Sequence, residues 1–326
     1  MAGKGQSPQM EGSAVTLAFV FPGQGSQAVG MLAELAARSP VVRATFDEAS
    51  AGAGADLWAI SQQGPEAELN RTESTQPALL AAGVAVWRAW HEAGGAAPTH
   101  LAGHSLGEYT ALVCAGAIEL AAGAALVRER GRLMQAAVPA GVGAMAAVLG
   151  ADDAVIGQAC ADAAQGEVVS PANFNSPGQT VIAGHAAAVD RALALLAERG
   201  VRKALKLPVS VPSHCALMRD AADALRARIA ALAWRLPALP VVQNADAVAH
   251  GSLAAIQDAL VRQLYLPVRW TGCVESLARA GVTRVAECGP GKVLSGLVKR
   301  IDKSLDGRAL GAPADFDAAL ESWRTA

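Results

Sequence analysis

The residues with the clearest chemical potential form the sequence GHSLG at 103–107, a G-x-S-x-G pattern. It lies between a short strand candidate at 99–102 and a segment at 108–115 with helical character. A sharp strand-to-helix turn of this kind presents a serine hydroxyl at a sheet edge, where N–H groups of the helix can stabilise an oxyanion. The pattern also fits a plain turn whose serine caps the helix. Its place between strand and helix favours Ser105 as a nucleophile.

A serine nucleophile needs a base, and six histidines are available. His104 directly precedes the serine, so its side chain should point away from the hydroxyl. His214 lies in VPSHC at 211–215, where a proline stiffens the approach to a predicted helix. The other four occupy turns, loops or element ends, where solvated or capping roles are typical: His91, His100, His185 and His250. His214 is therefore the favoured base, although only the fold can bring it to Ser105.

An arginine on an apolar helix face is the second chemical feature. In the helix predicted at 125–137, Arg130 shares a face with the apolar residues Leu126, Leu133, Met134 and Ala137. A buried guanidinium is costly without an anionic partner. A structural salt bridge or a snorkelling stem is the commoner explanation, and a fork that binds a substrate carboxylate is the functional one. We favour the functional explanation because a serine nucleophile lies nearby in the chain.

Two glycine-rich segments fit nucleotide sites poorly. The sequence GQGSQA at 23–28 resembles a weak dinucleotide fingerprint, but the acidic pair at 47–48 lies in a helical segment and not at the end of a second strand. GPGK at 289–292 lacks the full phosphate-loop pattern and fits a turn before a helix. The first segment is better explained as bringing the backbone amide of Gln24 to a reacting carbonyl. We therefore expect no bound cofactor.

Alternating strands and helices predict an α/β fold with a largely parallel sheet covered on both faces. The predicted elements include helices at 78–92, 216–233 and 253–263 and a strand at 168–172. The order changes after residue 140, where strand, helix, strand, strand, helix and strand follow one another, as in a ferredoxin-like unit. We therefore expect a loose tail at 1–13, a discontinuous main domain at 14–139 and 208–310, and an inserted small domain at 140–207.

Composition agrees with this organisation and excludes several classes of protein. The 326 residues are 52% hydrophobic, which is incompatible with disorder, and two domains are typical of this length. A formal net charge of −2 gives no electrostatic case for nucleic acid. Five dispersed cysteines indicate reduced thiols, and neither a disulfide framework nor a metal site. No apolar run is long enough for a membrane span, so we expect a cytoplasmic protein.

Eight segments, in this order, resemble the characteristic blocks of the malonyl-CoA:acyl carrier protein transacylase family. They are FPGQGSQ at 21–27, TQPALL at 75–80, GHSLGEY at 103–109, RGRLMQ at 130–135, NFNSPGQ at 173–179, VPSHCALM at 211–218, QLYLPVRW at 263–270 and GPGKVLSG at 289–296. The resemblance covers about residues 14–305. It implies an α/β-hydrolase-like parallel-sheet domain that carries an inserted ferredoxin-like domain.

The resemblance also implies roles for the residues that match. Ser105 would be the nucleophile acylated by malonyl-CoA, and His214 its general base and later acid. The main-chain carbonyl of Gln263 would orient the imidazole, and Arg130 would pair with the malonyl carboxylate. A neutral orienting group leaves the imidazole less basic than a carboxylate would, which suits a thiolate leaving group.

The remaining implied roles concern the oxyanion and the pocket. The backbone N–H groups of Gln24 and Leu106 would form the oxyanion hole, with Gln76 and Asn175 in the substrate pocket. Two departures from the family pattern, Cys288 and the segment at 243–246, are not expected to affect these roles.

The reaction implied is ping-pong transfer of malonyl from malonyl-CoA to the phosphopantetheine thiol of acyl carrier protein, by a monomer, in fatty-acid synthesis. A discrete malonyltransferase of a polyketide pathway is one alternative, and a serine thioesterase or hydrolase is another. Arg130 argues against a simple esterase, since an apolar acyl group would leave its charge unpaired. A non-catalytic binding module predicts loss of Ser105 or His214, and both are present.

Overall fold

A strand buried on both faces, β1 (Thr16–Phe21), lies at the centre of the main sheet, as its unbroken apolar run predicts. Its odd-numbered residues from Leu17 to Phe21 face one hydrophobic core, and Ala18 and Val20 face the other. The computed structural model describes residues 16–209 and 211–323, so the predicted tail at 1–13 lies outside the described residues.

The main sheet has six strands in the order β10-β9-β1-β2-β7-β8. All neighbours pair in parallel except β8, which returns antiparallel to β7. The other strands are β2 (His100–Gly103), β7 (Val241–Gln243), β8 (Val248–Ala249), β9 (Val282–Glu287) and β10 (Asp306–Ala309). The α/β class predicted from the alternation of elements is therefore present.

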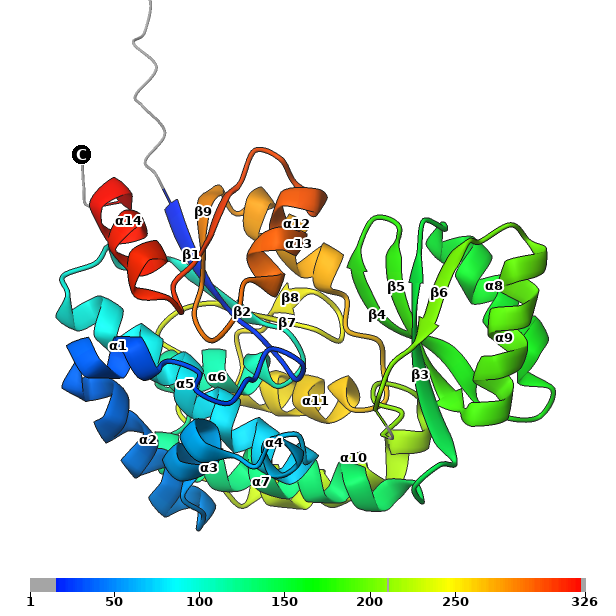
Figure 1. The fold of residues 1–326 in the computed structure, drawn as a ribbon, viewed down its shortest axis with the longest axis horizontal. Helices are drawn as coiled ribbons and strands as arrows, with labels where there is room; N and C mark the ends of the chain where they lie inside the picture. The colour runs from blue at the N-terminus through cyan, green and yellow to red at the C-terminus, as the bar shows by residue number, and fades with distance from the viewer. Residues whose placement is uncertain (1–15, 210, 324–326) are drawn as a thin grey trace, which may run out of the picture.

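Helices cover both faces of this sheet (Figure 1). On one face, α12 (Trp270–Arg279) and α13 (Val293–Ile301) enclose the smaller core. The larger core, on the other face, draws on α1 (Ala33–Arg38), α2 (Pro40–Ala53), α3 (Leu57–Gln63), α4 (Glu66–Leu69), α5 (Thr72–Glu92), α6 (Gly107–Cys114), α7 (Leu120–Ala137), a 3-10 turn at Ala216–Met218, α10 (Arg219–Ala230), α11 (Leu253–Gln263) and α14 (Pro313–Trp323).

A second, four-stranded sheet forms a separate layer beside the main unit (Figure 1). Its elements follow the order β3 (Gly143–Leu149), α8 (Asp153–Ala164), β4 (Val169–Ser176), β5 (Gln179–His185), α9 (Ala186–Glu198) and β6 (Lys203–Lys206). The strands lie in the order β4-β5-β3-β6, and every pair is antiparallel. Both helices pack on one face over a core of their own. The other face, which includes Met145 and Val181, contacts Cys215 of the main unit.

The observed elements differ from the predicted ones where tertiary contacts decide the structure. β4 extends to Ser176 because it pairs with β5 up to that residue, and Val268 of the main unit bonds to it at Ala172 and Phe174. The predicted helix at 216–233 is divided into the 3-10 turn and α10. Beyond the predicted end of the main domain at 310, α14 follows, and the ring centres of Trp323 and Trp90 lie 6.2 Å apart in the larger core. Among the described residues, no helix has both the length and the apolar character that a membrane crossing requires.

Candidate active site

A tight turn between β2 and α6 carries Ser105 in the left-handed region, with φ of 51°. The flanking glycines are required sterically: a Cβ on Gly103 would lie 1.8 Å from the carbonyl carbon of Gly107. Two amide side chains hold the serine backbone. Its N–H donates to Oδ1 of Asn244 at 2.8 Å, and its carbonyl accepts from Nε2 of Gln263 at 2.9 Å. The turn therefore holds Ser105 in a fixed strand-to-helix position, which is the geometry that the G-x-S-x-G pattern predicts.

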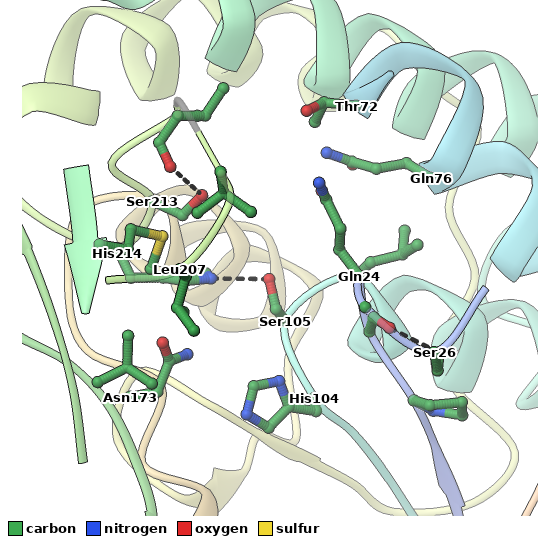
Figure 2. Close-up of a pocket in the computed structure, with 18 of the residues that line it drawn as sticks. Gln24, Ser26, Thr72, Gln76, His104, Ser105, Asn173, Leu207, Ser213 and His214 are labelled. Carbon is green, nitrogen blue, oxygen red and sulfur yellow. Dashed lines mark hydrogen bonds between the residues drawn. The ribbon is translucent and has the colours of Figure 1, made fainter. Parts of the chain in front are cut away.

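His214 lies opposite the serine, and its Nε2 is 2.7 Å from Ser105 Oγ (Figure 2). Its Nδ1 is 2.7 Å from the carbonyl oxygen of Gln263. Because a carbonyl can only accept, Nδ1 carries the proton and Nε2 accepts from the serine hydroxyl. The imidazole is only 3% exposed, and burial, reinforced by the positive charge of Arg130, lowers its pKa from 6.5 to about 3. The ring is thus neutral near pH 7, which is the state that a general base needs.

Arg130 reaches the same hydroxyl from α7 and is only 1% exposed. Its Nη2 lies 3.3 Å from Ser105 Oγ and 3.0 Å from Oε1 of Gln263, and its Nη1 donates to Oε1 of Gln76 at 2.8 Å. The guanidinium carbon is 5.3 Å from the centre of the Tyr109 ring. These three hydrogen bonds to described residues all go to neutral oxygens. A buried cation that has no direct carboxylate partner within 16–209 and 211–323 can therefore receive an anionic group beside Ser105.

A cavity of about 370 Å³ opens above Ser105 between the two units. Gln24 and Gln76 lie on one side of it and His214 on the other (Figure 2). Leu106 and Asn175 also line it, and Asn175 Oδ1 is 2.8 Å from Nε2 of His104. The ring of His104 thus points to Asn175, as expected for a residue turned away from the hydroxyl. Gln263 lies behind the cavity wall, so the fold brings all eight predicted site residues into one region.

Three contributions to this site escaped the sequence analysis: the side chains of Asn244, Gln263 and Glu108. Glu108 lies one helical turn after the serine, and its carboxyl group accepts from the backbone N–H of Asn244 and from Nε2 of Gln263. The expectation that the segment at 243–246 leaves the site unaffected is wrong, because Asn244 binds the Ser105 backbone directly. The sequence signal was present in the Gly-x-Ser-x-Gly-Glu order and in the polar pair that ends β7. The role of these residues becomes clear only from the pairing of β7 with β2, which brings the end of β7 to the Ser105 turn.

The described residues contain no group of three or more His, Cys, Asp or Glu side chains arranged to hold a metal ion. Comparison with known families gives a match to the one described as "Acyl transferase domain" over residues 18–308. The chain belongs to the acyl transferase family. This acyltransferase thereby fulfils the expectation drawn from the eight sequence blocks.

Named relatives of this acyltransferase cover nearly its whole length. The malonyl CoA-acyl carrier protein transacylase of Escherichia coli K12 is 59% identical over 304 residues, which are 93% of this chain and 98% of the relative. The solved malonyl-CoA:acyl carrier protein transacylase of Xanthomonas oryzae is 69% identical, with a TM-score of 0.94 over 95% of this chain and 99% of that one. A malonyl-transacylase solved in complex with a type II PKS acyl-carrier protein is 55% identical, with a TM-score of 0.93 over 94% of this chain and 99% of that one.

Proposed function

We propose that this acyltransferase moves a malonyl group from malonyl-CoA to the phosphopantetheine thiol of acyl carrier protein, in fatty-acid synthesis, through a malonyl ester on Ser105. One observation carries the proposal: Ser105 Oγ lies 2.7 Å from the neutral base nitrogen of His214 and 3.3 Å from the guanidinium of Arg130. A nucleophile beside a fixed buried cation fits an acyl group with a free carboxylate. The names of the curated relatives support the same substrate and acceptor.

In the first half-reaction, Ser105 Oγ attacks the thioester carbonyl and its proton passes to Nε2 of His214. The carbonyl oxygen becomes an oxyanion, for which the backbone N–H groups of Gln24 and Leu106 are our candidates because both residues line the cavity at Ser105. The carbon–sulfur bond then breaks, and the departing thiolate takes the proton from His214. A weakly basic imidazole is sufficient here, since a thiolate leaves readily without prior protonation.

In the second half-reaction, the carrier thiol gives its proton to His214 and attacks the malonyl ester. The ester bond breaks, and Ser105 recovers its proton from the imidazolium. Arg130 holds the malonyl carboxylate throughout, while Gln76 keeps the guanidinium oriented through its 2.8 Å hydrogen bond. Asn175, on the opposite wall with His104, is our candidate for contact with the rest of the substrate.

We also propose that the small unit is a ferredoxin-like domain inserted at 140–207 into an α/β-hydrolase-like domain at 14–139 and 208–323, extended from 310 to include α14. The β-α-β-β-α-β order, the antiparallel strand order β4-β5-β3-β6 and the separate core beneath α8 and α9 support this division. Five free cysteines, four of them buried, support action in the reducing cytoplasm. A monomer stays the prediction for the oligomeric state.

A hydrolase is less well supported, because water in place of the carrier thiol gives no reason for Arg130 to lie beside the nucleophile. One solved relative is in complex with a type II PKS acyl-carrier protein. The experiment must therefore ask which kind of carrier, fatty-acid or polyketide, this acyltransferase prefers. Transfer rates with a fatty-acid carrier and with a polyketide carrier answer this question. A higher specificity for the polyketide carrier would replace fatty-acid synthesis with the polyketide pathway.

The chemistry is tested by intact-protein mass spectrometry after mixing with malonyl-CoA. The wild-type protein should gain one malonyl group and lose it on addition of a carrier protein that bears phosphopantetheine. Ser105→Ala should gain none, whereas Ser213→Ala, a serine that lines the same cavity, should still be acylated. An adduct that persists in Ser105→Ala would exclude this nucleophile. Malonate release that is equally fast with and without the carrier would indicate a hydrolase.

A further inference from the structure

A carboxyl group that the transfer mechanism does not use lies beneath the nucleophile. Glu108 is on α6, one turn after Ser105, and its side chain has no solvent exposure. Isolation of a carboxyl group from water is unfavourable unless polar contacts compensate for the lost hydration. The contacts of this carboxyl therefore indicate what its placement does.

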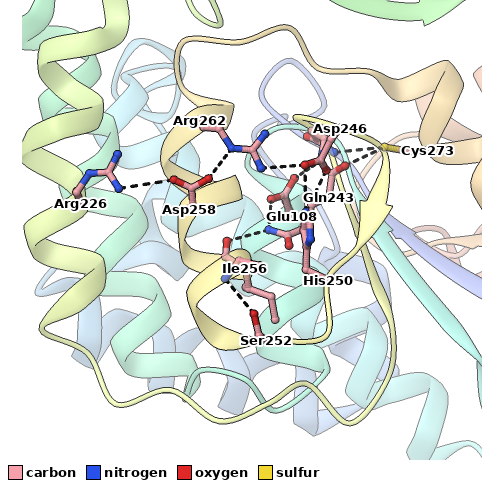
Figure 3. Close-up of polar contacts among 12 residues, drawn as sticks. Glu108, Arg226, Gln243, Asp246, His250, Ser252, Ile256, Asp258, Arg262 and Cys273 are labelled. Carbon is pink, nitrogen blue, oxygen red and sulfur yellow. Dashed lines mark hydrogen bonds and ion pairs between the residues drawn. The ribbon is translucent and has the colours of Figure 1, made fainter.

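Glu108 accepts three hydrogen bonds from the segments that hold the serine. Oε2 accepts from the backbone N–H of Asn244 at 2.7 Å and from Nε2 of Gln263 at 3.0 Å, and Oε1 accepts from Nε2 of Gln243 at 3.1 Å. Figure 3 shows the carboxyl beside Gln243, with α11 alongside. Two of these partners, Asn244 and Gln263, are the residues that bind the backbone of Ser105. One carboxyl group therefore holds both of the residues, Asn244 and Gln263, that bind the turn at Ser105.

The side chain of Gln263 extends this link to the substrate cation. Its Nε2 donates to Glu108, and its Oε1 accepts from Nη2 of Arg130 at 3.0 Å. The same residue supplies the carbonyl that orients His214. The side-chain amide of Gln263 therefore has a suitable partner at each end: its nitrogen faces the acceptor oxygen of Glu108, and its oxygen faces the guanidinium of Arg130. This arrangement fixes the orientation of the amide and, through it, the position of the guanidinium.

We propose that Glu108 is a positioning residue of the transfer reaction: through Asn244 and Gln263 it holds the Ser105 turn in its reactive conformation, and through Gln263 it aligns Arg130 with the malonyl carboxylate. The second part rests on the proposed malonyl-transfer function, and the first does not. Loss of the carboxylate should therefore lower two separate quantities, the reactivity of the serine and the preference for a malonyl over an acetyl group.

Glu108→Gln is the direct test, because it keeps the size of the side chain and replaces one acceptor oxygen with an N–H donor. The new amide has an acceptor within reach: Oε1 of the neighbouring Gln243 is buried and has no hydrogen-bond partner among the described residues, although turning that amide gives up its hydrogen bond to the carbonyl of Ile256. We expect the rate of Ser105 acylation by malonyl-CoA to fall at least tenfold and the ratio of malonyl to acetyl acylation to fall at least threefold.

Glu287→Gln is the matched control. Glu287 is also a buried carboxyl that accepts backbone N–H groups, those of Leu294 and Ser295 at the start of α13, but it has no contact with the two residues that hold the Ser105 turn. The control should lose thermal stability and change both kinetic quantities by less than twofold. Equal kinetic effects of the two substitutions would overturn the proposal, because Glu108 would then be only a structural carboxyl.

Gln263→Leu tests the same link with the carboxylate intact. It removes the contacts of the side chain with Ser105, Glu108 and Arg130 but keeps the main-chain carbonyl that binds His214. We expect both losses again, and in the double variant with Glu108→Gln an acylation rate no more than threefold below that of the slower single variant. If the double variant lost acylation rate by the product of the two single losses, Glu108 and Gln263 would act independently and the proposed link between them would be contradicted.

Labelling of Ser105 by a fluorophosphonate probe separates this inference from the function on which it partly rests. The probe reports the reactivity of the serine without any malonyl group. A tenfold slower labelling of Glu108→Gln upholds the positioning of the turn even if the wild-type protein were to transfer another acyl group. Labelling of Glu108→Gln at the wild-type rate would overturn it.

Discussion

Arg130 and His214 act on Ser105 with competing electrostatic effects. The guanidinium that is available to a carboxylate also helps to lower the pKa of the imidazole that must accept the serine proton. When an anionic acyl group binds Arg130, its charge offsets that of the guanidinium near the base. Under the proposed malonyl transfer, the carboxylate that binds Arg130 would therefore also raise the pKa of His214, and the site would couple recognition of the carboxylate to the reactivity of the serine.

Arg130→Ala should abolish the preference for the malonyl group. Loss of a buried charge-assisted contact costs about 1.5–3 kcal/mol, which corresponds to roughly a 10- to 160-fold fall in the ratio of malonyl to acetyl transfer. Acetyl-CoA should gain in relative terms. Competition between the two thioesters, read by mass spectrometry of the acyl-enzyme, measures the ratio.

Arg132→Ala is the control on the same helix, because Arg132 is exposed and pairs with Glu73 and Glu129. It should leave the ratio unchanged. If Arg130→Ala and Arg132→Ala behaved alike, the assignment of Arg130 to the carboxylate would be wrong.

At the scale of elements, the close approach of β1, β2 and α6 fixes where the nucleophile lies. A Cβ on Gly107 would lie 2.0 Å from the carbonyl oxygen of Phe21, at the end of β1. Gly107→Ala should therefore push α6 away from the sheet and cost about 1–3 kcal/mol of unfolding free energy. It should also slow acylation, since Ser105 moves with the helix start.

Gly157→Ala on α8 is the matched control, because its added Cβ meets no atom within 4 Å. Higher helix propensity should leave the protein as stable or stabilise it by up to about 1 kcal/mol. Urea unfolding measures both changes. Equal effects of the two substitutions would contradict the steric explanation.

Elements with strong local signals were predictable from the sequence. The bounds predicted for α11, 253–263, match the observed helix, since Ser252 caps it and its apolar residues recur at helical spacing. α5 begins six residues before the predicted 78 because its polar first turns, from Thr72 to Gln76, are buried by tertiary contacts that no local pattern reveals. Tertiary packing overrides propensity in such cases.

The candidate site was predictable to the extent that its residues lie in recognisable motifs. Ser105, His214 and Arg130 were found in this way, and the fold brings them together. The hydrogen bonds of Asn244 and Gln263 to the Ser105 backbone were not predicted, because they join segments 139 or more residues apart. Such a contact cannot be predicted from the pattern of neighbouring residues in the sequence.

At the scale of the whole molecule, two buried groups give stability opposite dependences on pH. Burial raises the pKa of Glu108 from 4.5 to about 7, so the folded state binds a proton that the unfolded state releases, and stability falls as pH rises through this range. The pKa of His214 is lowered from 6.5 to about 3, so stability falls as pH drops below 6.5. Between about pH 4.5 and 6.5 the two contributions oppose each other.

Glu108→Gln removes the first contribution and leaves the second. The unfolding free energy of this variant should therefore rise more steeply between about pH 5 and 7 than that of the wild-type protein. Urea unfolding at several pH values in this range measures the slope. Glu287→Gln is not a suitable control here, since burial raises the pKa of that carboxyl as well. Parallel curves for Glu108→Gln and the wild-type protein would show that Glu108 takes up no proton on folding.

The two-unit architecture predicts that residues 140–207 fold without the rest of the chain. Their core beneath α8 and α9 is formed entirely within this segment, whereas the opposite face is covered by Cys215 and Leu217. At this size the isolated segment should be marginally stable, and should unfold cooperatively in urea as followed by circular dichroism.

Neighbouring residues on β5 make this prediction specific, because Ile182 faces the inner core and Val181 faces the main unit. In the isolated segment, Ile182→Ala should lower the free energy of unfolding by about 2–5 kcal/mol and abolish the transition. Val181→Ala should be tolerated there, because the main unit that covers Val181 in the whole chain is absent. In the whole chain Val181→Ala should also be destabilising, since the contact with the main unit is then present. An isolated segment with no cooperative transition would mean that the small sheet depends on its pairing with Val268 and that the chain folds as a single unit.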